Sequence, residues 1–142
     1  MPLTDSIRLS FGFRDVRGLV ANFHQADVRA QREIRRAVKD AGDFFLDLGY
    51  FLAPVDSSWM RDHLRARYSD DGLVFEGGYR SEDFVGRTGY DGREITEFYP
   101  PLVEDGTRKM AAQPHVRPAF EEATDYLSRD VSRSLRRAIA RR

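Results

Sequence analysis

Cysteine is absent from this chain of 142 residues. Its absence excludes disulfide bonds, thiolate nucleophiles, and zinc or iron–sulfur sites built on cysteine. Histidine is scarce, because the chain contains only His24, His63 and His115. No two of these have the i, i+4 spacing of a helical metal site. The sequence therefore predicts neither a metal centre nor a cofactor.

Motifs of common enzyme classes are also missing. The chain has no Gly-x-Ser-x-Gly turn of a serine hydrolase and no Gly-Lys-Ser/Thr phosphate loop. Asp56, His63 and either Ser57 or Ser58 lie close together in sequence, but a catalytic triad is defined by its geometry. We therefore expect a protein that is not an enzyme and has no small-molecule substrate. A hydrolase centred on His63 is the less favoured alternative.

Long apolar runs are missing as well. No segment approaches the roughly 18 apolar residues that a membrane span needs. The first residues also lack the basic and apolar regions of a signal peptide. The sequence thus predicts a soluble protein that is made in a cytoplasm and has no membrane partner.

The net charge is zero, because 23 basic residues balance 23 acidic ones. This balance argues against nucleic-acid binding by the chain as a whole. The charge is uneven, however, and residues 129–142 hold one acid, Asp130, and six arginines: Arg129, Arg133, Arg136, Arg137, Arg141 and Arg142. Such a run is most often a solvated helix end. It is also suited to bidentate contact with DNA phosphates or with the acids of a neighbouring subunit.

Apolar periodicity predicts two long helices. Apolar residues recur at intervals of three or four through residues 25–52, and Pro54 disfavours further helix. Gly42 and Gly49 within this segment indicate either close packing or a bend. The same periodicity predicts a last helix from about residue 116 to the end of the chain. A shorter helix is expected over residues 14–23.

Alternating apolar residues predict strands. Residues 6–13 alternate strictly, and two β-like runs, residues 64–68 and 73–75, flank the turn sequence Ser69-Asp70-Asp71-Gly72. We expect a further strand over residues 94–103, at an edge or bulged because prolines cannot donate to a ladder.

Two loops complete the predicted architecture, a long exposed loop or irregular hairpin over residues 77–92 and a second loop over residues 104–114. The order of elements is β, long α, several β and long α. This order predicts one domain over residues 1–142 with an α+β fold, in which both long helices pack on one antiparallel sheet.

Three sequence blocks lie between or beside the long helices. Residues 53–64 read Ala-Pro-Val-Asp-Ser-Ser-Trp-Met-Arg-Asp-His-Leu, residues 99–110 read Tyr-Pro-Pro-Leu-Val-Glu-Asp-Gly-Thr-Arg-Lys-Met, and residues 112–119 read Ala-Gln-Pro-His-Val-Arg-Pro-Ala. In this order the blocks resemble the gene-product-ten-like family of long-tailed bacteriophages. Its members are head–tail joining, tail-completion or minor tail proteins. The resemblance covers roughly residues 15–140.

The chain departs from the family pattern at several points. Ser57-Ser58 stands where Thr-Gly is usual, Pro100-Pro101 replaces a small residue, and His115 replaces an aromatic one. Residues 77–92 resemble an insertion. These departures concern edge geometry and partner contacts more than the fold.

The resemblance implies a structural protein of the virion, located at the head–tail junction. It implies a ring of this chain, with a hexamer favoured and a dodecamer as the alternative. The implied neighbours are a head-completion protein and the tail terminator or tail tube, and the ring would keep the DNA channel continuous. The C-terminal arginines would contact the DNA or a neighbouring protein. A small DNA-binding module that uses the Arg-rich C-terminal helix is the alternative function.

Two regions are candidate subunit contacts. Exposed loops between rigid elements often supply the repeated contact that a ring requires. The loop before the last helix therefore provides these candidate contact residues: Glu104, Asp105, Gly106, Thr107, Arg108, Gln113 and Pro114. Fold architecture explains the same residues, since Gly106 suits a positive φ and Thr107 suits a turn. Trp59, the only tryptophan, is either a core residue or an interface anchor.

Overall fold

The computed structural model of the chain describes residues 8–12, 28–54 and 58–140. Its elements follow the order β1 (Arg8–Gly12), α2 (Val28–Leu52), α3 (Ser58–His63), β2 (Arg65–Tyr68), β3 (Val74–Gly78), the 3-10 turn η3 (Ser81–Asp83), α4 (Pro100–Asp105) and α5 (Val116–Ala140). The helix expected over residues 14–23 lies outside the described residues.

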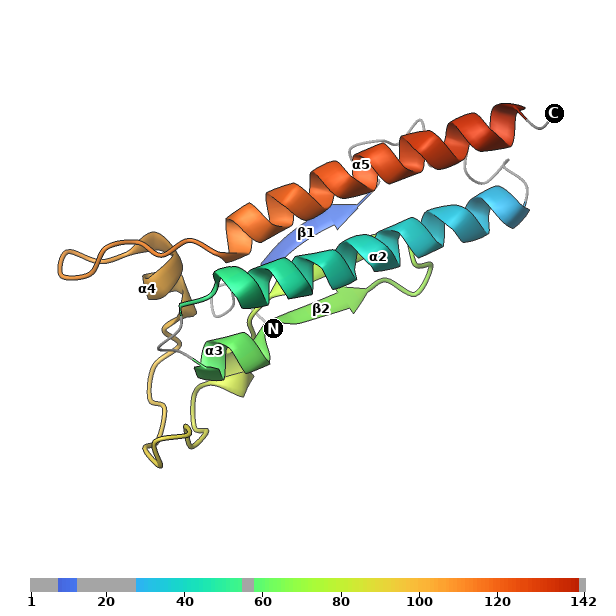
Figure 1. Ribbon diagram of the computed structural model, residues 1–142. Coiled ribbons are helices and arrows are strands. Elements are labelled where there is room, and N and C mark those ends of the chain that lie inside the picture. Colours follow the sequence, from blue (N-terminus) through green and yellow to red (C-terminus); the bar gives the residue numbers. More distant parts are fainter. Residues whose placement is uncertain (1–7, 13–27, 55–57, 141–142) are drawn as a thin grey trace.

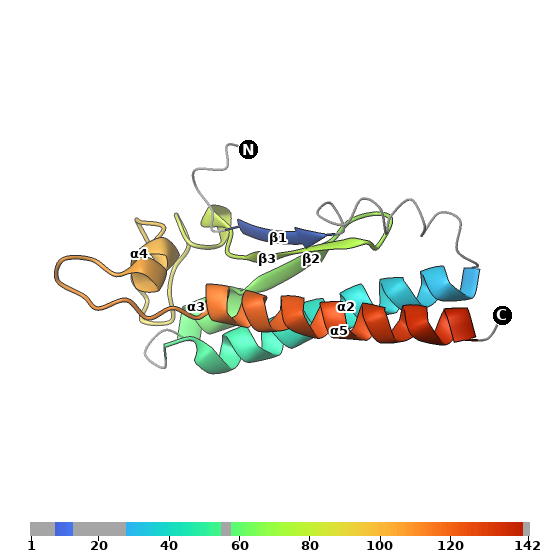
Figure 2. The ribbon, with the colours of Figure 1, turned by 90° about the horizontal axis from the view of Figure 1, so that it is seen from above.

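The described elements form two layers, as Figures 1 and 2 show. The long helices α2 and α5 run antiparallel and side by side, and together they cover one face of an antiparallel sheet. The sheet has three strands in the order β1-β3-β2. The predicted α+β fold, with both long helices on one antiparallel sheet, is therefore confirmed.

The sheet is built around the central strand β3. Phe75 of β3 is paired with Phe11 of β1 on one side and with Tyr68 of β2 on the other. The hairpin between β2 and β3 closes through a hydrogen bond from Ser69 N to Val74 O at 2.9 Å. Gly72 has a φ of 73° in this turn, which glycine adopts without strain. The predicted turn is confirmed, and so are three of the four predicted strands, the first of them over the described residues Arg8–Gly12.

Helix α2 ends at Leu52, where the sequence predicts it to end. Its buried stripe consists of Ile34, Ala37, Val38, Ala41 and Phe45, which have the three- and four-residue spacing of a helix face. Gly42 and Gly49 belong to close packing, because a Cβ on Gly42 would lie 2.3 Å from the Tyr68 hydroxyl and one on Gly49 2.3 Å from Leu64 Cδ2.

The core between the layers is largely aromatic. The Phe45 ring of α2 lies 6.1 Å from the Phe120 ring of α5 and 6.3 Å from the Phe75 ring of β3. Gly77 makes room for Phe45, because a Cβ at Gly77 would lie 2.3 Å from that ring. The buried residues of α5 are Val116, Ala119, Ala123, Leu127 and Val131. This stripe has the spacing of a helix face and confirms the predicted C-terminal helix, as far as the side chains of α5 are described.

The strand predicted for residues 94–103 is wrong. Glu94 makes only an isolated bridge with Thr88, and Pro100 and Pro101 occupy the first positions of helix α4. A first helical turn has no intrahelical acceptor for its N–H groups, so prolines there lose no hydrogen bond. The Pro-Pro pair that appeared to interrupt a strand instead begins a helix.

The prediction for residues 77–92 is partly wrong. A hairpin does form beyond η3, with hydrogen bonds from Gly86 N to Ile95 O and from Ile95 N to Arg87 O. However, β3 extends to Gly78, and the side chains of Tyr79 and Phe84 are completely buried. The first part of the segment therefore belongs to the core. The short helix α3 is also not predicted by the sequence.

Candidate interaction surfaces

The side chain of Glu104, at the end of α4, caps the N-terminus of α5. Its Oε2 atom accepts hydrogen bonds from His115 N at 2.9 Å and Val116 N at 3.1 Å, and its Oε1 atom accepts one from Arg117 N at 2.9 Å. The first N–H groups of a helix have no intrahelical acceptor, and a carboxylate also interacts favourably with the helix dipole. Glu104 thereby joins α4 to α5.

These donors determine the protonation of Glu104, which is only 3% exposed. Burial raises the pKa of the carboxyl, but hydrogen bonds from the His115 side chain and from three backbone N–H groups lower it more. The net effect lowers the pKa of Glu104 from its ordinary value of 4.5 to about 2. The group is therefore a carboxylate at neutral pH, and hydrogen bonds from the protein stabilise its charge.

His115 links this cap to the sheet. Its Nδ1 atom lies 3.1 Å from Glu104 Oε2 and 3.1 Å from Gln113 O, and its Nε2 atom lies 2.7 Å from the Tyr79 hydroxyl. Carboxylate and carbonyl oxygens only accept, so Nδ1 carries a proton. In a neutral imidazole Nε2 then accepts from the Tyr79 hydroxyl. Burial, and next the Glu104 charge, raise the pKa of Tyr79 and keep this hydroxyl protonated.

The α4–α5 loop, residues 106–114, projects beyond the start of α5, as Figure 1 shows. Its residues 107–114 are all exposed. Gly106 has a φ of 77°, and a turn joins Thr107 N to Met110 O at 2.8 Å, while Gln113 N donates to Val103 O at 2.8 Å. The loop is thus held in shape at its base and at its tip. The positive φ of Gly106 and the turn at Thr107 agree with the sequence prediction.

The predicted contact residues of this loop differ in exposure, and Gly106 is half-buried. Glu104 is buried and its oxygens are engaged within the chain, so it positions the loop and offers no surface to a neighbour. Exposed residues are Asp105, Thr107, Arg108, Gln113 and Pro114. Asp105 also makes an ion pair with Arg117 at 3.5 Å.

Trp59 belongs to an aromatic group on the α3 side of the molecule. Its ring stacks on His63 with centroids 4.2 Å apart, and Tyr90 lies against it with centroids 5.0 Å apart. The indole N–H donates to Asp83 O at 3.0 Å. Trp59 is half-buried, and its described contacts fix the position of the hairpin over α3. They account for the buried part of Trp59, and a contact of its exposed part with a neighbouring subunit stays a prediction.

An ion pair and hydrogen bonds attach η3 and the hairpin that follows it to the rest of the fold. Asp83 is buried and accepts from Arg65 Nε at 2.6 Å and Arg65 Nη2 at 3.2 Å. The Tyr90 hydroxyl donates to Asp62 Oδ2 at 2.6 Å. Bidentate pairs of this kind fix orientation as well as distance. The segment that resembles an insertion is thus attached to α3 and β2.

His63, the centre of the alternative hydrolase interpretation, is oriented by its own helix. Its Nδ1 atom hydrogen-bonds to Trp59 O at 2.7 Å, and Trp59 stacks on its ring. Ser58 is exposed at the first position of α3. Asp56 and Ser57 lie outside the described residues, so of that triad the structure describes only His63 and Ser58.

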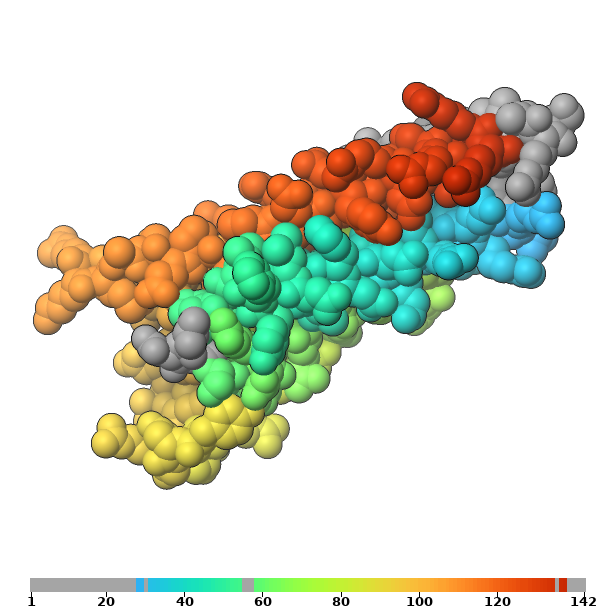
Figure 3. Space-filling view, in the orientation of Figure 1, coloured from blue at the N-terminus to red at the C-terminus, as the bar shows by residue number. Residues whose placement is uncertain are grey.

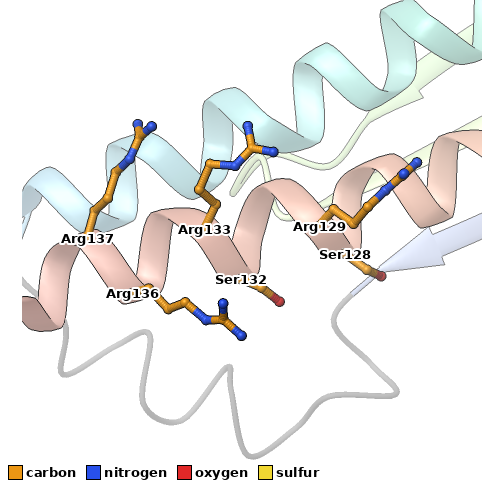
Figure 4. A pocket seen from close by; sticks show the side chains of 6 residues that line it. All are labelled: Ser128, Arg129, Ser132, Arg133, Arg136 and Arg137. Carbon is orange, nitrogen blue, oxygen red and sulfur yellow. The ribbon is translucent and has the colours of Figure 1, made fainter.

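The C-terminal arginines form an open groove along α5, shown in Figure 4. Arg129, Arg133 and Arg137 form one row, and Ser128, Ser132 and Arg136 form the next. All four arginines are exposed. Arg129 Nε donates to Asp125 O at 3.3 Å. Arg141 and Arg142 lie outside the described residues.

Two further properties limit the chemistry of the described residues. Within residues 8–12, 28–54 and 58–140, no group of three or more histidine, aspartate or glutamate side chains is arranged to hold a metal ion. No helix in the same part of the chain is long and apolar enough to cross a membrane.

Comparison of the chain with family models, with curated protein sequences and with solved structures finds no match.

Proposed function

We propose that this chain is a structural protein of the phage neck, which forms a ring that joins the tail to the head connector. The ring would surround the DNA channel and lie between a head-completion protein and the tail terminator or tail tube. The proposal rests on the three ordered sequence blocks, and on one structural relationship between two of them.

That relationship is the cap made by Glu104. Glu104 belongs to the block that reads Val-Glu-Asp-Gly-Thr, and its three donors belong to the block that reads Pro-His-Val-Arg-Pro. A buried carboxylate thus brings the two blocks into contact in the fold. The sequence alone gives no reason why the two blocks occur together. What the two blocks hold between them is the exposed α4–α5 loop.

The α4–α5 loop is the favoured ring contact. A ring requires a heterologous contact, in which one patch of each copy meets a different patch of the next. A loop that is exposed but held in shape has little conformational entropy to lose when it docks. Met110 adds an apolar contact at the tip, where its side chain is 36% exposed. The contact is assigned to residues 107–114 and excludes Glu104.

A small DNA-binding module is the second candidate function. The observation in its favour is the row of exposed arginines on α5, Arg129, Arg133 and Arg137. Such contacts are independent of sequence and weaken as salt rises. Replacing Arg133 and Arg137 by Glu would abolish retardation of duplex DNA at low salt if this function is correct, and would leave retardation unchanged if it is wrong.

Disruption of the gene in a phage that encodes this chain tests the neck function. Electron microscopy of the lysate should show separate heads and completed tails, and expression of the intact chain in trans should restore joined particles. Joined, infectious particles formed without the chain would overturn the proposal. Empty lysates with neither heads nor tails would also contradict it, because a neck protein acts after both parts are made.

A further inference from the structure

The helical layer has an outer face, which points away from the sheet and is the face seen in Figure 3. Phe44 of α2 and Tyr126 of α5 stack across this layer with ring centroids 5.4 Å apart. Both rings are partly exposed, at 37% and 36%. Residues three, four or seven positions from these two share their side of each helix, and those that are not buried are Asp40, Asp47, Leu48, Phe51, Glu122, Arg129, Asp130 and Arg133.

Charge is segregated along this layer. In α2, residues 28–39 contain five basic side chains and one acidic one, whereas residues 40–52 contain three aspartates and no base. In α5, residues 116–127 contain three acids and one arginine, whereas residues 128–140 contain four arginines and one aspartate. Each helix therefore has a basic half and an acidic half.

The antiparallel packing places like halves together. Because Phe44 lies opposite Tyr126 and Phe45 lies near Phe120, the basic start of α2 lies beside the basic end of α5, as Figure 1 shows. One end of the layer thus carries nine basic and two acidic side chains, but one of the nine, Arg35, lies on the sheet side, where its Nε donates to Asp71 O at 2.9 Å. The other end carries six acidic side chains and one arginine.

The helix dipole favours the pattern of α5, whose acids lie in its first half and whose arginines lie in its second half, but it does not explain the pattern of α2. The bases of α2 lie at the positive end of its helix dipole, where the first turn contains no acidic residue, and both arrangements are unfavourable. Like charges brought together also repel each other. Within the described part of the chain, five arginines at the basic end make no ion pair: Arg29, Arg32, Arg133, Arg136 and Arg137.

We propose that the outer face of the α2–α5 layer binds a second copy of this chain, packed antiparallel about a two-fold axis. In that arrangement the acidic half of each copy faces the basic half of the other. The stacked pair Phe44 and Tyr126 lies near the axis, and Phe51, which is 77% exposed, extends the apolar contact. An apolar centre with a charged rim is the usual anatomy of a protein interface.

The size of the face fits this partner. A helix of 25 residues is about 37 Å long at 1.5 Å per residue. Two such helices side by side present a face about 20 Å wide, hence roughly 700 Å² per copy. A standard stable interface buries about 800 Å² per partner.

A nucleic acid fits the same face less well. It would meet the acidic half of the layer as well as the basic half, and like charges repel. Nucleic-acid-binding domains usually have a pI above about 9, and this chain has a sequence pI of about 6.8. The self-complementary pattern therefore favours a second copy. The contact uses a surface other than the α4–α5 loop, so it goes beyond the proposed ring and can fail independently of it.

Sedimentation of the purified intact chain at two salt concentrations is the first test. At about 0.05 M salt the protein should be a dimer, and the dissociation constant should rise by about tenfold or more at about 0.5 M, where screening shortens the reach of charges. A chain that stays monomeric at low salt up to about 100 µM would overturn the proposal. Retardation of duplex DNA by such a monomer would assign the basic end to nucleic acid instead.

Complementary charge reversal is the sharper test. Arg133→Glu with Arg137→Glu replaces two bases of the basic half by acids in one variant, and Asp47→Arg with Glu122→Arg replaces two acids of the acidic half by bases in a second variant. All four residues are exposed, so circular dichroism should show an unchanged fold. Each variant alone should be monomeric, and an equimolar mixture should form a heterodimer. Dimers of either variant alone, or a mixture that stays monomeric, would contradict the antiparallel arrangement.

Discussion

The Glu104 carboxylate lies 2.9 Å from the backbone nitrogen of His115, a residue eleven positions further along the chain. This contact closes the α4–α5 loop at its base and starts helix α5 at the same time. The position of the loop therefore depends on a buried charge, and so does the ring contact that we propose for the loop.

Glu104→Gln should reduce the free energy of unfolding by about 3 kcal/mol, because one pKa unit corresponds to about 1.4 kcal/mol and the pKa of Glu104 falls from 4.5 to about 2. An amide has one oxygen for three backbone donors and brings an N–H₂ group close to them. Urea denaturation measures the change. Glu97→Gln, at an exposed position, is the matched control and should cost less than about 0.5 kcal/mol.

The contribution of Glu104 should depend on pH with a defined sign. Its pKa in the folded state is depressed to about 2 from 4.5, so the stabilisation is fully present above pH 4.5. It should be lost as the pH falls from about 4.5 to about 2. The difference in unfolding free energy between the intact chain and Glu104→Gln should therefore shrink across this window. A difference that stays constant down to pH 2 would show that the carboxylate charge is not what stabilises the cap.

Gly106→Ala should destabilise the loop more than Gly86→Ala. Both glycines have a positive φ, 77° and 82°, and both substitutions carry a strain of roughly 1 kcal/mol. A Cβ at Gly106 would also lie 2.7 Å from Ala112 N, whereas nothing lies within 4 Å of one at Gly86. Thermal unfolding should separate the two variants by about 1 kcal/mol or more. Equal losses would mean that the loop adjusts freely around Gly106.

Gly77→Ala should cost about 2 kcal/mol or more, and Gly42→Ala much less. The added methyl at Gly77 meets the buried Phe45 ring at 2.3 Å, where overpacking forces the core apart. At Gly42 it meets the hydroxyl end of Tyr68, a side chain 39% exposed, whose outward displacement costs only its long hydrogen bonds to Lys39 O at 3.2 Å and Asp43 Oδ1 at 3.3 Å. Alanine also favours a helix over glycine by about 1 kcal/mol. Chemical denaturation of both variants measures the two losses of stability. A larger loss for Gly42→Ala than for Gly77→Ala would show that Gly77 is not needed for the close approach of the Phe45 ring.

Met110→Ser should impair virion assembly and leave the fold intact. The residue lies at the tip of the α4–α5 loop and is 36% exposed, so its unfolding free energy should change by less than about 0.5 kcal/mol. Loss of an apolar contact repeated around a ring should reduce complementation of a gene-disrupted phage by about tenfold or more. Val85→Ser, at a position 48% exposed outside this loop, is the control. Equal complementation by both variants would remove the loop from the ring contact.

The sequence predicted the parts of the fold that have a clear period. The stripe of α2 from Ile34 to Phe45 and the stripe of α5 from Val116 to Val131 are both buried as expected. The turn sequence from Ser69 to Gly72 forms the expected hairpin. In these segments local spacing and tertiary burial favour the same structure.

The predictions failed where a local signal is typical of two structures, or where the deciding contact is distant in sequence. Pro100-Pro101 reads as a strand breaker, yet the pair begins α4 and Pro100 is buried. The glycines around Tyr79 suggest a solvated loop, yet Tyr79 is anchored through its hydroxyl to His115, 36 positions away. Nor does any local signal mark Glu104 as the cap of a helix that begins twelve residues later. A capping residue normally directly precedes its helix.

Electron microscopy of intact virions, labelled with antibody against this chain, tests the central claim most directly. The phage must encode the chain, and particles without it are the control for specificity. The neck function predicts label at the junction between head and tail, on assembled particles. Label absent from virions, with the protein left free in the lysate, would contradict it.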